Sequence, residues 1–224
     1  MVNHIIPGLI VYLLLLISLS VHEWAHGYVA CKLGDPTPAT FGRLTLNPLA
    51  HIDVIGTIIV PLAVILLEPN FVILGWAKSV PIDPRYFKNH RKLCELMVSL
   101  AGPFSNLILA IFSAVVGSCL AKYFEGNIRA LFSLMALLNI ALFVFNLIPI
   151  PPLDGGYMLK VIFWISDELF FQISRWGLWV LLLLINIPAF HSILFRCVTE
   201  TFGMINTLTD SLFGLPQGAL LQFW

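Results

Sequence analysis

The sequence IIPGLIVYLLLLISLSVHEWAHGYVA, residues 5–30, combines a long apolar run with a polar cluster near its end. An α-helix needs about 20 apolar residues to cross a bilayer core of about 30 Å, so this run predicts a membrane-spanning helix. Counted from Ile5, His22 lies about 25 Å along that helix and is still within the apolar core. Ionisable groups at that depth are costly and usually functional. His22, Glu23 and His26 therefore require an explanation.

The composition extends this reading to the whole chain of 224 residues, of which 59% are hydrophobic and 11% charged. Soluble domains have about 25% charged residues, so this depletion indicates a lipid bilayer around the protein. The zero net charge gives no indication of nucleic-acid binding. The four cysteines show no paired spacing and predict no disulfide framework. Residues 1–20 contain no Lys or Arg, so we expect a retained helix rather than a signal peptide.

Further apolar runs follow at residues 52–67, 93–120, 130–150 and 173–187, with a weaker one at 190–198. We therefore expect an all-α integral membrane protein, a polytopic helix bundle of about five to six hydrophobic segments. The length fits a single membrane-embedded domain over residues 1–224. Within it we expect a catalytic core over about residues 8–160 and a C-terminal membrane or interfacial segment over about 161–224.

Two loops stand out between these runs. Residues 35–53 have turn residues at both ends and a β-like core at 41–46, which predicts a small hairpin near the polar cluster. Residues 75–92 contain a single acid, Asp83, and a cluster of five basic residues: Lys78, Arg85, Lys88, Arg91 and Lys92. The positive-inside tendency predicts that this second loop lies in the cytoplasm.

The polar cluster has the spacing of a metal site. His22 and His26 are four residues apart, so both imidazoles project from one helix face. Two such imidazoles can hold one Zn²⁺ at about 2.0–2.1 Å. Glu23 can then reach a water on the metal without being a ligand, which is the HExxH arrangement of zinc proteases with Glu as general base. The alternative is a helix end that has reached the lipid headgroups.

A catalytic zinc needs a third protein ligand, and Asp154 is a candidate. It lies in NLIPIPPLDGG, residues 146–156, at the end of another apolar run. The prolines of this stretch prevent a regular helix, and Gly155 and Gly156 allow close approach. Broken backbone at membrane depth is tolerated where it lines a cavity or is buried in protein, so a carboxylate presented there suits a metal. The alternative is an ordinary Pro-Gly turn at the membrane interface.

Taken together, these motifs resemble the site-2 protease family of zinc intramembrane metalloproteases. The resemblance rests on HEWAH, on NLIPIPPLDGG and on AGPFSN at residues 101–106. The stretches GRLTLNPLAHID and GWAKSVPI resemble small bacterial and archaeal members that lack an appended regulatory domain. The similarity covers roughly residues 8–160. It implies that His22, His26 and Asp154 are ligands of one Zn²⁺ per chain and that Glu23 is the catalytic base.

The resemblance also suggests roles for two asparagines. Asn146 corresponds to the family's asparagine before the proline run and is expected to hold the substrate backbone or the oxyanion; the alternative is a helix–helix hydrogen bond. For Asn106, helix packing and support of the site are equally open. We expect His51 to make a structural hydrogen bond, and we expect three other histidines to be interfacial: His4, His90 and His191.

The expected function is hydrolysis of peptide bonds within or near transmembrane helices of other membrane proteins. The partners are thus a transmembrane protein substrate and the bilayer, in the plasma membrane, with the site towards the cytoplasm. One alternative is a membrane-embedded zinc hydrolase of lipids or lipidated peptides. Another is a metal transporter, which would need ionisable ligands along several helices, whereas the predicted spans hold few.

Membrane topology gives one further expectation. If His22, His26 and Asp154 share a metal, the two helix ends that carry them lie on one side of the membrane. Residues 93–120 and 130–150 already supply two crossings between them, so residues 52–75 must add an even number. This segment is too short for two full helices of about 20 residues, which predicts a re-entrant hairpin.

Overall fold

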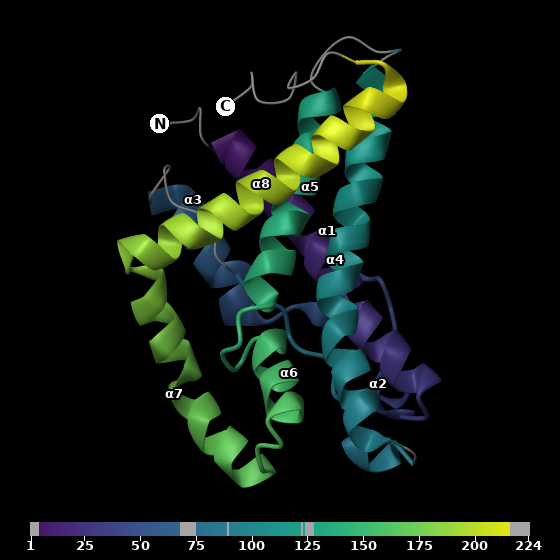
Figure 1. Ribbon diagram of the computed structural model, residues 1–224, viewed down its shortest axis with the longest axis vertical. Coiled ribbons are helices and arrows are strands. Elements are labelled where there is room, and N and C mark those ends of the chain that lie inside the picture. Colours follow the sequence, from purple (N-terminus) through teal and green to yellow (C-terminus); the bar gives the residue numbers. More distant parts are fainter. Residues whose placement is uncertain (1–4, 68–74, 89, 122, 124–127, 216–224) are drawn as a thin grey trace. The chain divides into compact units, whose positions relative to one another are not determined.

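The computed structural model describes residues 5–67, 75–88, 90–121, 123 and 128–215, and His4 lies outside them (Figure 1). Every regular element in these ranges is a helix. Four helices are long and apolar enough to cross a membrane: α1 (Ile5–Lys32), α4 (Arg91–Ala121), α5 (Ile128–Asn146) and α7 (Asp167–Ile185). The chain is therefore an all-α integral membrane protein, as predicted. The described residues contain four such spans, and the expected number of five to six is not confirmed.

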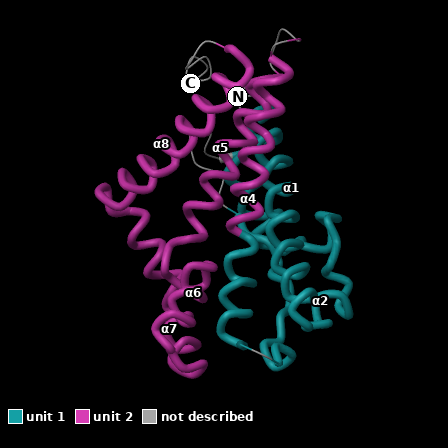
Figure 2. The backbone as a smooth tube through the Cα atoms, turned by 45° about the vertical axis from the view of Figure 1, so that its right-hand side comes forward, with its two compact units in different colours: residues 1–102 teal, residues 103–224 magenta. Residues whose placement is uncertain are grey.

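The chain forms two compact units, Met1–Gly102 and Pro103–Trp224, which Figure 2 shows in different colours. The boundary falls within α4, so this helix contributes its first part to one unit and the remainder to the other. The HExxH motif belongs to the first unit, and the proline-rich stretch with Asp154 belongs to the second.

In the first unit, α1 is apolar from its first turn to its middle and contains two buried serines. The hydroxyls of Ser18 and Ser20 donate to the carbonyls of Leu14 and Leu16, at 2.8 and 2.6 Å. These bonds within the helix satisfy the hydroxyls without water, which suits a membrane span. The C-terminal end of α1 packs on the start of α4 in a small core of Ala30, Phe87, Cys94 and Val98.

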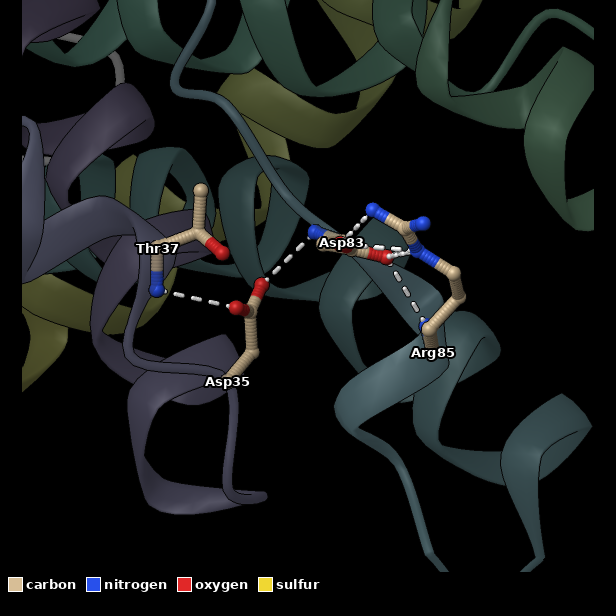
Figure 3. Close-up of polar contacts among 4 residues, drawn as sticks. All are labelled: Asp35, Thr37, Asp83 and Arg85. Carbon is tan, nitrogen blue, oxygen red and sulfur yellow. Dashed lines mark hydrogen bonds and ion pairs between the residues drawn. The ribbon is translucent and has the colours of Figure 1, made fainter.

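A fully buried carboxylate, Asp35, fixes the turn that follows α1 (Figure 3). It accepts the backbone N–H of Thr37, the first residue of α2 (Thr37–Thr40), at 2.9 Å and that of Asp83 at 2.8 Å. Asp83 in turn accepts from the backbone and the guanidinium of Arg85. The hydrogen bonds from Arg85 hold the pKa of the Asp83 carboxyl below its ordinary value. Asp35 therefore ties the loop after α1 to the loop before α4.

The predicted β-like segment at residues 41–46 is not confirmed. These residues form turns and bends, and no β-strand occurs in the described parts of the chain. The reason lies in the end of α2: the N–H groups of Phe41, Gly42 and Arg43 donate to carbonyls of residues 37–39. Gly42 has φ +66°, which closes this turn instead of extending the chain. The backbone donors of the first three residues of this segment are therefore already used.

The short 3-10 helix η1 (Pro48–His51) precedes residues 52–75, the segment predicted to be re-entrant. This segment begins with η2 (Val54–Ile59), which is a π-helix, and α3 (Val60–Leu67). Residues 68–74 lie outside the described residues. After them, Trp76 returns to the π-helix: its N–H donates to Gly56 O at 3.2 Å, and its carbonyl accepts from Thr57 Oγ1 at 2.8 Å. The two ends of this segment are therefore adjacent. The chain then runs on without regular structure to η3 (Pro84–Tyr86).

His51, at the start of this region, is 2% exposed, and its Nε2 lies 2.8 Å from the carbonyl oxygen of Thr45. The predicted structural hydrogen bond of His51 is confirmed. The Lys78 N–H donates to the His51 carbonyl at 2.9 Å, so the same residue also anchors the returning chain.

The second unit contains the remainder of α4, α5, α6 (Asp154–Ile162), α7 and α8 (Pro188–Phe213). Its core joins α4, α5 and α8 through small and branched side chains, namely Ala110, Ala114, Ala136, Ile140 and Phe202. Figure 1 shows α8 crossing α5. The helix is much longer than the weak run at residues 190–198 predicted, because buried polar residues such as Asn206 and Asp210 lower the hydropathy of its second half.

Asp210 is the centre of a buried polar cluster in this unit. Its Oδ1 accepts from Arg129 on α5 at 2.7 Å and from Ser118 on α4 at 3.0 Å. The Asp210 side chain is fully buried and that of Arg129 is 12% exposed. One carboxylate therefore links the C-terminal helix to two of the candidate spans.

Candidate metal centre

The three residues of the motif lie on adjacent turns of α1 and are all buried: His22 is 5% exposed, Glu23 8% and His26 7%. The four-residue spacing brings the two imidazoles together on one face of the helix. Their Nε2 atoms lie 3.1 Å apart, and the ring planes are nearly perpendicular, at 82°. Two ring nitrogens therefore converge on one point at the side of a membrane-spanning helix.

The separation of the two Nε2 atoms fits a zinc site. Two nitrogens bound at 2.0–2.1 Å in a tetrahedron lie about 3.3 Å apart, close to the observed separation. The Nδ1 atom of His26 lies 2.7 Å from the carbonyl oxygen of Val98 on α4. A carbonyl can only accept, so Nδ1 donates in this contact, and in the neutral ring Nε2 is then the nitrogen with the lone pair that a metal needs. Such an outer hydrogen bond is the usual way in which a metal-ligating histidine is oriented.

Glu23 is held by the main chain rather than by another side chain in this unit. Its Oε2 accepts the N–H of Val80 at 2.8 Å. Val80 belongs to the GWAKSVPI stretch and contacts α1 a turn further on, where a methyl group at Gly27 would lie 3.2 Å from its Cγ1. The returning segment therefore lies against the motif and orients the carboxylate.

Gly102 was not among the predicted site residues, although AGPFSN contains it. A methyl group there would overlap Nε2 of His26 and would lie 2.6 Å from Nε2 of His22. The lack of a side chain is therefore what lets α4 approach the two imidazoles. The glycine in that motif was the available signal, because a helix can approach two side chains this closely only at a position without a Cβ.

The other predicted site residues, Asp154, Asn146 and Asn106, lie in the second unit. Asn106 is fully buried and donates to Oδ1 of Asn139 on α5 at 2.8 Å, while Asn139 donates to the Met135 carbonyl. This asparagine pair joins α4 to α5, and sequence reasoning missed Asn139. Asn146, the last residue of α5, donates to the Leu142 carbonyl of its own helix at 3.0 Å.

Asp154 is the first residue of α6 and is half-buried. The two glycines after it pack on the backbone of the preceding turn: a methyl group at Gly155 would overlap the Ile148 carbonyl, and one at Gly156 would overlap the Pro151 nitrogen. The close approach predicted for this glycine pair is therefore confirmed. It draws α6 tightly against the proline-rich stretch that ends α5.

Comparison with known proteins agrees with this description. The model of peptidase family M50 matches residues 10–128 and 120–187. The "Putative zinc metalloprotease YwhC" of Bacillus subtilis is 42% identical over 153 residues, which are 65% of this chain and 65% of the relative. The "Putative zinc metalloprotease Rip2" of Mycolicibacterium smegmatis is 28% identical over 93% of this chain and 78% of the relative. "Zinc metalloprotease MJ0392" of Methanocaldococcus jannaschii is 29% identical over 71% of this chain and 36% of its own length.

No solved structure matches the chain. The match to the Bacillus relative spans just under two thirds of that protein's length.

Convergent imidazoles and a neighbouring carboxylate on a membrane-spanning helix define the class of membrane-embedded zinc metallopeptidases. The chain belongs to peptidase family M50, the site-2 protease type of this class, and its cofactor is Zn²⁺. The predicted family is thereby confirmed. The alternatives of a lipid hydrolase and a metal transporter are not favoured by these similarities.

Proposed function

We propose that this chain hydrolyses peptide bonds within or near transmembrane helices of other membrane proteins. The observation that carries this proposal is the convergence of the His22 and His26 Nε2 atoms, 3.1 Å apart, beside the carboxylate of Glu23. The similarity to proteins named as zinc metalloproteases supports the same reaction. The position of the motif supports a transmembrane substrate in this proposal, because α1 carries it within an apolar candidate span.

His22, His26 and Asp154 would hold the zinc. When bound, Zn²⁺ supplies Lewis-acid chemistry, which polarises a scissile carbonyl and increases the acidity of the attacking water. Asp154 completes the set in this proposal because it is a half-buried acid at the start of α6, held by tight backbone packing. One zinc per chain is expected.

Glu23 would act as the general base. Its Oε2 is engaged by the Val80 N–H, so Oε1 is the atom that takes the proton from the attacking water. The same oxygen then gives the proton to the nitrogen of the leaving amine as the C–N bond breaks. Fixing one oxygen by a backbone donor keeps the other in one place, which is the preorganisation that proton transfer requires.

The substrate helix must unwind before attack, since its peptide groups are bonded internally. In our proposal Asn146 holds the exposed substrate backbone or the oxyanion, and Asn106 supports the site through Asn139. In this proposal the irregular stretch at residues 41–46 pairs with an extended substrate, as in β-augmentation, through backbone groups of residues 44–46 that the turn after α2 does not use.

We also propose that residues 52–75 form a re-entrant hairpin, which is supported by the contact of Trp76 with Gly56 and Thr57. This segment would add to the four spans to give the five to six segments of one domain. The basic loop at residues 75–92 and the site then lie on the cytoplasmic side of the plasma membrane. Single cysteines at Lys88 and Asn3, in a background without other cysteines, test this: labelling of both from the same side contradicts the topology.

The central test compares wild type with Glu23→Gln in detergent and in cells. We expect the variant to retain stoichiometric zinc and wild-type thermal stability, and to lose cleavage of a transmembrane substrate. Accumulation of uncut membrane proteins in cells with Glu23→Gln would identify the substrate. Cleavage at the wild-type rate would contradict the proposed function.

A further inference from the structure

The turn that leads to Asp154 is in backbone contact with α7. Gly177 is buried in the middle of this helix, although its neighbours Trp176 and Leu178 are 68% and 48% exposed. A methyl group at Gly177 would overlap the backbone carbonyl oxygen of Pro151. Because the obstructing atom belongs to the backbone, no change of rotamer could relieve the overlap. Any side chain at position 177 would have to displace either α7 or the turn.

Two side-chain contacts extend this approach along α6. The rings of Tyr157 and Phe170 lie 4.8 Å apart between centroids, and Lys160 Nζ lies 2.6 Å from Asp167 Oδ1. Residues successively further along α6 thus meet residues successively earlier in α7. The two helices form an antiparallel pair, which Figure 1 shows joined at one end. The turn at Pro151 lies at the other end of this pair, against Gly177.

A second glycine, on α6, also approaches the backbone of this turn. Gly156 on α6 approaches the nitrogen of Pro151, whereas Gly177 on α7 approaches its carbonyl. Pro151 is therefore enclosed between two glycines from two helices. Protein interiors transmit such displacements because they are close-packed, so a shift of α7 would be passed through Pro151 to the start of α6.

We propose that Gly177 is a positioning residue for the metal centre: by allowing α7 to contact Pro151, it sets the direction in which α6 presents the Asp154 carboxylate. This inference rests on the proposed function, in which Asp154 is a zinc ligand. Ligands must be held within about 0.5 Å of the productive geometry. A shift of α6 that makes room for one methyl group at position 177 is therefore large enough to weaken zinc binding. Changes to the groups that orient a metal ligand typically lower metal affinity about 10- to 100-fold.

The test is a competition titration of Zn²⁺ into purified protein, together with the visible spectrum of the Co²⁺ form. Gly177→Ala should lower zinc affinity about 10- to 100-fold and alter the Co²⁺ spectrum. Gly203→Ala on α8 is the matched control, because a methyl group there meets nothing within 4 Å. Its zinc affinity and spectrum should equal those of wild type. Thermal unfolding reports whether each variant is folded.

Phe170→Leu provides a second variant in case Gly177→Ala does not fold. It weakens the contact with Tyr157 without creating an overlap, and should lower zinc affinity by a smaller factor. Wild-type affinity in the folded Gly177→Ala protein, or in Phe170→Leu if the first does not fold, overturns the inference. Asp154→Asn in the same titration separates the two proposals. If Asp154→Asn loses zinc and the Gly177 and Phe170 variants do not, the positioning role of Gly177 is wrong and Asp154 remains a ligand. If Asp154→Asn binds zinc like wild type, the ligand assignment and the positioning role are both wrong.

Discussion

The backbone N–H of Val80 donates to Oε2 of Glu23 at 2.8 Å, which links the motif on α1 to a residue 57 positions later. A backbone donor cannot be removed by shortening a side chain, so its effect has to be tested with proline. A hydrogen bond to a charged group contributes about 1.5–3 kcal/mol.

Val80→Pro should therefore lower kcat by about 10- to 100-fold, because the base loses the bond that orients it. Zinc stoichiometry should be unchanged, since Val80 is not among the three residues proposed to hold the zinc. Val80→Ala keeps the N–H and is the control, with kcat close to wild type. Equal kcat values for the two variants would show that the hydrogen bond has no part in turnover.

Gly102→Ala should weaken zinc binding and destabilise the fold. The added methyl group would overlap Nε2 of His26 and approach Nε2 of His22, so the imidazoles must move. Overpacking of this kind costs about 1–3 kcal/mol. Zinc titration and thermal unfolding in detergent measure the two effects. A fully stable variant with wild-type zinc affinity would mean that α4 does not approach the motif in this way.

The buried pair of Arg129 and Asp210 gives a prediction about stability alone. Asp210→Ala leaves Arg129 buried without its anion, which should cost about 3–5 kcal/mol. The exposed pair of Arg196 and Glu200 on the same helix is the control, and Glu200→Ala should cost about 0.5 kcal/mol or less. Equilibrium unfolding in detergent measures both. Equal costs would show that water reaches Asp210.

The loop carboxylate Asp83 should make stability depend on pH. Arg85 lowers its pKa in the folded protein, so this stabilisation is full above the unfolded pKa near 3.8 and is lost as pH falls through the lower folded value. The effect is small because Asp83 is solvent-accessible. Melting temperatures of wild type should fall between about pH 5 and pH 3 more than those of Arg85→Gln. Lys88→Gln, which removes a charge from the same loop, should behave like wild type.

The sequence predicted the parts of this protein that depend on apolar length and on helical spacing. The candidate spans α1, α4, α5 and α7 correspond to apolar runs, and the i, i+4 pair of His22 and His26 places both imidazoles on one face. The family followed from the same motifs. Run length and residue spacing are sufficient to predict these features, because each depends only on residues within one helix.

The main-chain contacts around the motif on α1 were not predicted. The Val80 N–H has no signature in the sequence, because every residue except proline carries the same backbone donor. The glycine at position 102 was visible in AGPFSN, but nothing in the sequence indicated that the two imidazoles lie beside it. The β-like stretch at residues 41–46 is not confirmed for a related reason: its composition did not reveal that the turn after α2 uses the backbone donors of residues 41–43. Asn139 was overlooked because a buried amide within an apolar run shows its role only through its partner, Asn106.

The enclosure of Pro151 between Gly156 and Gly177 implies an unusual pattern of mutational tolerance. At a core position such as Ile140, substitutions should rank by hydrophobicity, and at Asp154, the proposed third ligand, by the ability of the side chain to coordinate zinc. At the two glycines they should rank by volume alone, so that serine and alanine are nearly equal and valine and threonine are nearly equal. A saturation scan of the second unit would thus separate positions where the chemistry of the side chain matters from positions where only its volume matters.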